Sequence, residues 1–284
     1  MKALSIYVPT RGRLHRENLV TLEQFRVANM QEWVTLVCPL EEVTPWFDRY
    51  GDFKILPEPY HIGNIGAKRA WMFDHCQTRY FFMVDDDISF AHQYHDPETN
   101  QRATSAVNSD PSRFRYFMTE HLLELFYKYD SVGIGSRLFC NTRPMVMENR
   151  KLGWAWGLDK QAKNMRKHLK PVFDRQITMY DDIDWNLTLL EYGHRNIISS
   201  YIIAQAGKEA EVPDDGGIGL YRTSESVIED GNRFMAAHPG VVTESKRYTD
   251  FKNRTSNSLS GRFIIHWTRA FEAKFPGGCQ YVDN

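Results

Sequence analysis

The residues with the clearest chemical character are three consecutive aspartates behind a hydrophobic run. Residues 80–84 read YFFMV, and Asp85, Asp86 and Asp87 follow directly. Three like charges at the end of a buried strand are costly unless a cation neutralises them. Divalent cations such as Mg²⁺ and Mn²⁺ bind carboxylates together with substrate phosphates, and alternation along a strand would turn Asp85 and Asp87 toward one ligand. The run therefore predicts a metal site that faces a diphosphate; the alternative is an exposed acidic turn.

Short apolar segments around this run predict a mainly parallel α/β sheet. The candidate strands are residues 3–8, 33–38, 53–56 and 80–84. Each is an apolar run bounded by a turn or polar signal, and a helix over 64–76 fits before the last of them. Ligands of such sheets bind outside the carboxyl ends of the strands. The turn at residues 9–12, PTRG, and the aspartate run would therefore lie at the same edge.

The rest of the chain is less regular. Residues 93–112 are polar and rich in turn formers, which indicates a loop, whereas 114–129 carry apolar residues at helical spacing. A further helix is expected over 181–192, with acids in its first turn and Gly193 after it. Acids at that position either complement the helix dipole or take part in chemistry. Residues 213–217, PDDGG, indicate a turn.

Composition places the chain among globular proteins, because it is 42% hydrophobic, 25% charged and 13% aromatic. No run supplies the ~18 apolar residues that cross a bilayer, so we expect no membrane partner and a cytoplasmic location. The four cysteines form no CxxC pair, which argues against a zinc knuckle. The net charge is −1, yet Lys and Arg outnumber acids nine to three within 143–175 and eight to three within 233–274. Such stretches favour a polyanionic partner or are simply solvated.

The motifs together resemble the GT-A glycosyltransferases, which take a sugar from a nucleotide-sugar and carry a DxD motif at a strand end. Residues 6–13, IYVPTRGR, are similar to the first strand and turn of that fold, and 64–69, NIGAKR, to the helix start that approaches the nucleotide. A glycine-containing helix start offers free N–H groups to phosphate or ribose oxygens. The donor-binding residues implied by the resemblance are Pro9, Thr10, Arg11, Arg13, Asn64, Lys68, Arg69, Asp85 and Asp86.

The acidic helix start, DDIDW, resembles that of inverting GT-A enzymes, which usually carry Glu-Asp and a third acid. On that match Asp182 is the base that deprotonates the acceptor hydroxyl, and Asp181 is the acid before it, with Asp in place of the usual Glu. A carboxylate suits this role because the hydroxyl acidifies as the glycosidic bond breaks. The match implies an inverting transfer.

Two further features complete the expected site. His266, in FIIHW, resembles the histidine that joins Asp85 and Asp87 in metal coordination in many GT-A proteins; the alternative is a packed core histidine. Trp154 and Trp156, in GWAWG, would stack on the acceptor from a flexible segment that the family places near donor and acceptor; the alternative is two core tryptophans.

Over the whole chain the resemblance is to the TET-associated glycosyltransferases, a GT-A group linked to sugar addition on hydroxymethylated pyrimidines in phage DNA. It is carried by VPTRGR, VDDD, DDIDW, DDGGIGLYR and IIHW. It implies a twisted sheet flanked by helices, a catalytic domain over 1–200, and a mixed, acceptor-side C-terminal part over 201–284 packed with it. It also implies Mn²⁺ or Mg²⁺, a UDP-sugar, and double-stranded DNA that carries 5-hydroxymethylcytosine or a similar base.

DNA agrees with the basic stretches, in which Lys246 and Arg247 are the nearest candidates for phosphate contacts. Other functions stay open. A glycosyltransferase of a saccharide or other small acceptor would share the donor site but show no salt-sensitive DNA binding. A non-catalytic nucleotide- or DNA-binding module would release no nucleotide from a nucleotide-sugar. A nucleotidyltransferase is disfavoured, because no glycine-rich, basic signature follows the first strand.

Overall fold

The computed structural model describes residues 2–60, 62–96, 101–137, 145–175, 177–178, 180–206, 224–245 and 263–272. The strands are β1 (Leu4–Pro9), β2 (Val34–Pro39), β3 (Lys54–Glu58), β4 (Tyr80–Val84), β5 (Ile88–Asp96), β6 (Gln101–Ala106), β7 (Ser131–Ser136), β8 (Val146–Glu148), β9 (Ala155–Asp159), β10 (Asn196–Ala206), β11 (Val242–Glu244) and β12 (Phe263–Ile265). The α-helices are α1 (Val20–Val27), α2 (Val43–Tyr50), α3 (Ile65–His75), α4 (Pro111–Tyr116), α5 (Leu122–Phe126), α6 (Met165–Arg175), α7 (Asp181–Glu191), α8 (Ser224–Ala237) and α10 (Trp267–Glu272). Shorter helical turns are η1 (Gln31–Trp33), η2 (Leu40–Glu42), η3 (Val107–Ser109) and the π-helical η4 (Phe117–His121).

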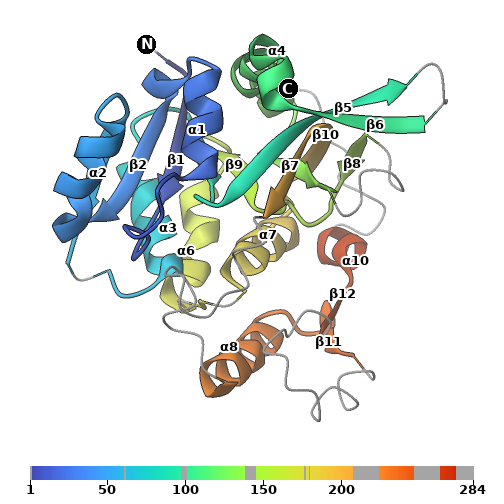
Figure 1. The fold of residues 1–284 in the computed structure, drawn as a ribbon. Coiled ribbons are helices and arrows are strands. Elements are labelled where there is room, and N and C mark those ends of the chain that lie inside the picture. Colours follow the sequence, from blue (N-terminus) through green and yellow to red (C-terminus); the bar gives the residue numbers. More distant parts are fainter. Residues whose placement is uncertain are drawn as a thin grey trace.

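One large mixed sheet organises the described chain. Its order is β3-β2-β1-β4-β9-β7-β10-β5-β6, with β8 paired to β10, and β11-β12 form a second, small sheet (Figure 1). The four predicted strands are confirmed as β1 to β4, and they pair in parallel. Antiparallel pairing begins where β9 lies between β4 and β7. The predicted α/β class is confirmed.

The loop predicted over 93–112 is wrong for the described residues 93–96 and 101–112, which are mostly strand and helix. They include the end of β5 and all of β6, an antiparallel hairpin that extends from one end of the sheet (Figure 1). The side chains of β6 are exposed or half-buried, because this strand is last in the sheet order. A polar sequence suits such an exposed strand, which is why its composition resembles that of a loop.

Side chains alternate between two cores on the faces of the sheet. Ile6, Val8 and Phe82 belong to a core with α1 and α2, whereas Tyr7 and Met83 belong to a core with α3, α6 and α7. A third core joins α7 to α8, α10 and the small sheet. None of the described helices is long and apolar enough to span a membrane.

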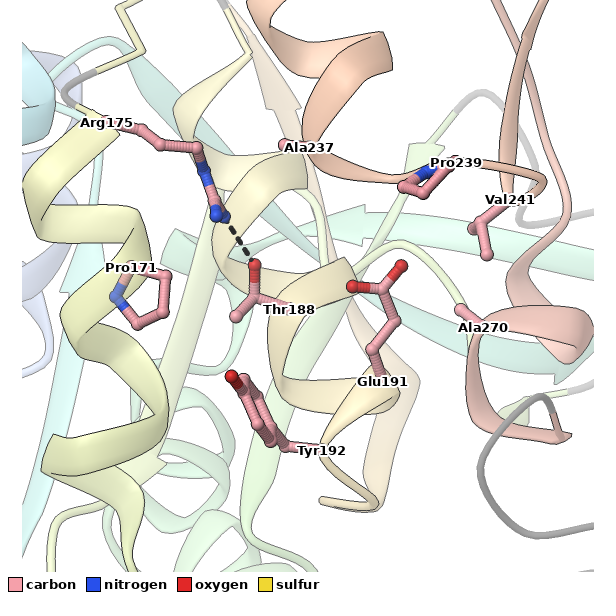
Figure 2. Close-up of a pocket in the computed structure, with 9 residues that line it drawn as sticks. All are labelled: Pro171, Arg175, Thr188, Glu191, Tyr192, Ala237, Pro239, Val241 and Ala270. Carbon is pink, nitrogen blue, oxygen red and sulfur yellow. Dashed lines mark hydrogen bonds between the residues drawn. The ribbon is translucent and has the colours of Figure 1, made fainter.

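An ion network also attaches the C-terminal segment to α7. Fully buried Asp184 accepts hydrogen bonds from Arg175 Nη2, at 2.5 Å, and faces His238 Nε2 at 2.8 Å; His238 Nδ1 lies 3.0 Å from Glu191 Oε2. Burial lowers the pKa of His238, but the hydrogen bonds and charges of Asp184 and Glu191 raise it overall. Figure 2 shows Arg175 and Glu191 beside a cavity of about 300 Å³ between α6, α7 and the segment after α8. Because both ring nitrogens face carboxylates, this geometry suits an imidazolium.

Candidate active site

The carboxyl end of β4 brings the three aspartates to the expected edge of the sheet. All five residues of β4 are buried, and the chain leaves the strand at Asp85, whose N–H donates to the Trp154 carbonyl at 3.3 Å. Asp86 and Asp87 are only 4% and 8% exposed, whereas the side chain of Asp85 is 28% exposed. The run is therefore no exposed acidic turn, and Asp85 is its most accessible member.

Arg13 neutralises part of the negative charge of the run. Its guanidinium lies 3.4 Å from Asp86 Oδ1 and 3.3 Å from Asp87 Oδ2, and the side chains of all three residues are largely buried. Burial raises the pKa of Asp86 to about 6, although the charge of Arg13 opposes the rise. An arginine of the β1–α1 connection therefore supplies part of the positive charge that the run requires, and the metal ion at this run stays a prediction.

Arg69 of α3 connects the aspartate run to the acidic start of α7. Its Nη2 donates to Asp85 Oδ1 at 2.9 Å, and its Nη1 forms a short ion pair with Asp181 Oδ2. Asn64 caps the helix, since its Oδ1 accepts from the Ala67 N–H at 2.8 Å. Gly66 allows close packing here, because a Cβ at this position would lie 2.9 Å from the Ile177 carbonyl oxygen. Two carboxylate groups far apart in sequence thus meet around one guanidinium.

The two acids of the α7 start differ in exposure. Asp181 is buried against Arg69, and burial raises its pKa to about 7, with the charge of Arg69 opposing the rise and those of Asp182 and Asp85 adding to it. The Asp182 side chain is 19% exposed, and its Oδ2 lies 3.5 Å from the Lys151 ammonium. Asp182 is therefore the acid that an acceptor hydroxyl could reach. Lys151 was not predicted as a site residue, because its only signal in the sequence is its place in a basic stretch.

The other predicted donor residues lie around Glu58, which no sequence pattern indicated. Lys68 Nζ donates to the Thr10 carbonyl at 2.7 Å and lies 2.8 Å from Glu58 Oε2. Arg11 Nε donates to Glu58 Oε1 at 3.0 Å. Burial lowers the pKa of Lys68, although the charge of Glu58 opposes this. Pro9 ends β1 just before this group. The basic side chains are thus held by one buried glutamate at the carboxyl end of β3.

His266 does not join Asp85 and Asp87 in a three-ligand cluster. Across the described residues, no three side chains of His, Cys, Asp or Glu are grouped so that they could hold a metal ion. His266 follows β12, where its N–H donates to the Val241 carbonyl at 2.9 Å. A magnesium-type ion needs only one or two protein carboxylates when a diphosphate supplies further oxygens. Asp85 suits that arrangement, because it is the most exposed aspartate of the run and only its Oδ1 is engaged by Arg69.

Of the four residues expected to contact the acceptor, the structure describes the two tryptophans. GWAWG is not a flexible segment, because Ala155 begins β9. Trp156 is 2% exposed and packs edge-on against Trp185, with ring centroids 5.4 Å apart, so it is a core residue that cannot stack on a ligand. Trp154 is partly buried against the core on the other face of the sheet. Lys246 and Arg247 lie outside the described residues.

The family model of the TET-associated glycosyltransferases matches residues 4–212, which include the aspartate run, Arg69 and the start of α7. The chain belongs to this family. It is therefore a glycosyltransferase with a nucleotide-sugar donor, and the resemblance read from its motifs is confirmed. No curated protein is significantly similar to the chain.

Solved structures that resemble this glycosyltransferase do so only distantly. S. aureus TarS 1-349 in complex with UDP-GlcNAc is 13% identical, with 96% of this chain and 79% of that chain covered and a TM-score of 0.44. The mannosyltransferase PcManGT from Pyrobaculum calidifontis, in complex with GDP-Man and Mn²⁺, is 12% identical, with 72% of this chain and 56% of that chain covered and a TM-score of 0.41. The inositol-1-phosphate CTP transferase from T. maritima is 11% identical, with 82% of this chain and 97% of that chain covered and a TM-score of 0.43.

Proposed function

We propose that this glycosyltransferase moves a sugar from a UDP-sugar to a hydroxymethylated pyrimidine in DNA, with inversion at the anomeric carbon. One observation carries the proposal: Arg69 holds Asp85 and Asp181 together, so the end of β4 and the start of α7 share one site. The donor diphosphate would lie on the Asp85 side, and the acceptor hydroxyl would approach Asp182.

The side chains of the site then have different roles. Asp182 takes the proton of the acceptor hydroxyl as the bond to the leaving nucleotide breaks. Arg69 and Asp181 are positioning residues, because they are buried and fix the relation of α7 to Asp85. Asp85 would bind Mn²⁺ or Mg²⁺ together with the diphosphate, and Arg13 would keep Asp86 and Asp87 in place. When bound, the metal supplies positive charge that stabilises the leaving diphosphate.

DNA as the acceptor is supported by the family and by the chain's charge pattern. The family is named for its association with TET. Two stretches of the sequence carry a large excess of Lys and Arg, although the net charge of the chain is −1. Such segregation favours a polyanionic acceptor, because each phosphate contact adds affinity independent of base sequence.

The test is a transfer assay with defined acceptors. The protein is incubated with Mn²⁺, a panel of nucleotide-sugars and duplexes that carry cytosine, 5-hydroxymethylcytosine or 5-hydroxymethyluracil, and the nucleosides are then weighed by mass spectrometry. We expect the mass of one glycosyl unit on hydroxymethylated bases alone, with the largest yield from a UDP-sugar. Transfer to saccharides but to none of the duplexes would contradict DNA as the acceptor.

A further inference from the structure

A cavity of about 330 Å³ lies beside α7 and has no part in the site described above. Arg150, Trp267 and Arg269 line it, together with His266, Thr268, Glu272 and Ile265. It lies where α10 packs on α7 and Arg150 contacts α10, since Arg150 Nη1 donates to Thr268 Oγ1 at 2.9 Å. The cavity therefore combines residues of two segments that are far apart in sequence.

The described residues give this cavity a positive charge. Among those that line it, two are arginines and only Glu272 is acidic. Within the described chain, no carboxylate forms an ion pair with Arg150 or Arg269; the polar partner of Arg150 is a hydroxyl, and Arg269 Nη1 donates to the Gly240 carbonyl at 3.1 Å. Arg13 and Arg69, in contrast, are buried against carboxylates. Guanidinium groups without a carboxylate partner bind phosphate oxygens well, because their forked N–H groups match that geometry.

The backbone fixes this cavity next to the acceptor side of the site. The Arg150 carbonyl accepts hydrogen bonds from Asn186 of α7, at 2.8 Å, and from Asn196 of β10, at 2.9 Å. The following residue, Lys151, places its ammonium 3.5 Å from Asp182 Oδ2. Lys151, Arg150 and Arg269 therefore connect Asp182 to the cavity. The two buried asparagines fix the backbone of Arg150 between them.

We propose that this cavity, with Arg150 and Arg269, binds a backbone phosphodiester of the acceptor strand while Asp182 faces the modified base. Trp267 is half-buried at the same cavity and offers an apolar wall beside the phosphate. The proposal deepens the proposed function, because it rests on a nucleic acid as acceptor. The same chemistry could hold a phosphate of the donor nucleotide, and the test below separates the two sources.

The test measures the affinity for a hydroxymethylated duplex by fluorescence anisotropy at several salt concentrations, in Arg150→Met, Arg269→Met and Arg150→Lys. Each Met variant should weaken duplex binding roughly tenfold and lower the slope of log K against log salt by about 0.9. Arg150→Lys should restore much of that slope. Affinity for the UDP-sugar, measured by calorimetry, should stay unchanged. Thermal unfolding establishes that the variants are folded, and Arg115→Met, which removes an exposed arginine on α4, is the matched control.

The other outcomes distinguish failure of the phosphodiester site from failure of the DNA acceptor. Wild-type duplex affinity and salt slope in both Met variants would overturn the phosphodiester site, while transfer to DNA by the same proteins would leave the proposed function intact. Loss of UDP-sugar affinity in the Met variants would assign the cavity to the donor and overturn the proposal. If the wild-type protein neither binds nor modifies the duplex, the DNA acceptor and this site fail together.

Discussion

At the scale of single residues, Arg69 donates to Asp85 through one nitrogen and pairs with Asp181 through another while it is itself buried. Removing one partner of a buried ion pair costs about 3–5 kcal/mol, because a charge is left without compensation. We therefore expect Arg69→Met to lower the free energy of unfolding by about that amount in urea titrations. A loss below about 1 kcal/mol, which is typical of exposed pairs, would contradict the joining role of Arg69.

The Arg69→Lys variant tests whether the positive charge of Arg69 is sufficient or its forked hydrogen-bond geometry is also needed. Lysine keeps the positive charge but lacks the forked pair of donors that serves two carboxylates at once. In this variant the rate of transfer should fall while the free energy of unfolding changes less than in Arg69→Met. The reason is that Asp85 and the start of α7 would no longer be fixed relative to each other. Equal transfer rates for Arg69→Lys and the wild-type protein would show that this relation does not matter for catalysis.

The sequence predicted the acidic residues of the site but not their ion pairs. An aspartate run behind an apolar strand, or in the first turn of a helix, is a local pattern. The arginine partners are not local: Arg13 lies 74 positions before Asp87, and Arg69 lies 112 positions before Asp181. Such pairs depend on how the elements pack, so the sequence could not show that Arg13 supplies part of the positive charge beside the run.

At the scale of elements, β9 fixes the position of β4 and hence of Asp85. Gly157 allows this close pairing, because a Cβ there would lie 2.4 Å from the Phe81 carbonyl oxygen and 2.5 Å from Phe82 Cδ2. Overpacking of a core costs about 1–3 kcal/mol, so Gly157→Ala should lower the unfolding free energy by at least that much and reduce turnover. Gly63→Ala is the control for stability, since a Cβ there meets no atom within 4 Å. Equal stability of the two variants would refute the packing argument.

His238 makes the attachment of the C-terminal segment to α7 dependent on pH. Its pKa is raised above the ordinary value of 6.5, so its contribution to stability is complete below about that pH and is lost as pH rises through the raised value. His238→Asn should cost about 3–5 kcal/mol at pH 6, and the difference from the wild-type protein should shrink toward pH 9. Urea titrations at the two pH values measure it, with exposed His95→Asn as control. A difference independent of pH would contradict the imidazolium.

Elements with a strong local pattern were predicted well. Tyr80–Val84 is β4 without any shift of its ends, and Asp181–Glu191 is helical as expected. The hairpin of β5 and β6 was missed, and GWAWG was assigned to a flexible segment although Ala155–Asp159 is β9. Both errors arise because sheet partners, not local composition, decide whether such segments are strands.

In the molecule as a whole, the family match ends at residue 212, yet the described chain beyond it packs on α7. Phe234 of α8 and Phe271 of α10 share a core with Leu187 and Leu190 of α7. Figure 1 shows α8, α10 and the small sheet on one side of α7, away from α1 and α2. The described C-terminal segment therefore lies beside the helix whose Asp182, on the proposed function, would meet the acceptor.

Donor binding and transfer, compared in two variants, separate the roles of Asp85 and Asp182. In the proposed function the end of β4 and the start of α7 form one site, where Asp85 binds the donor and Asp182 deprotonates the acceptor. By calorimetry with a UDP-sugar and Mn²⁺, Asp85→Asn should lose at least about tenfold in donor affinity. Asp182→Asn should bind the donor as the wild-type protein does, while its turnover falls by about 10²–10⁴-fold. Equal loss of donor affinity in both variants, or wild-type turnover in Asp182→Asn, would contradict these roles.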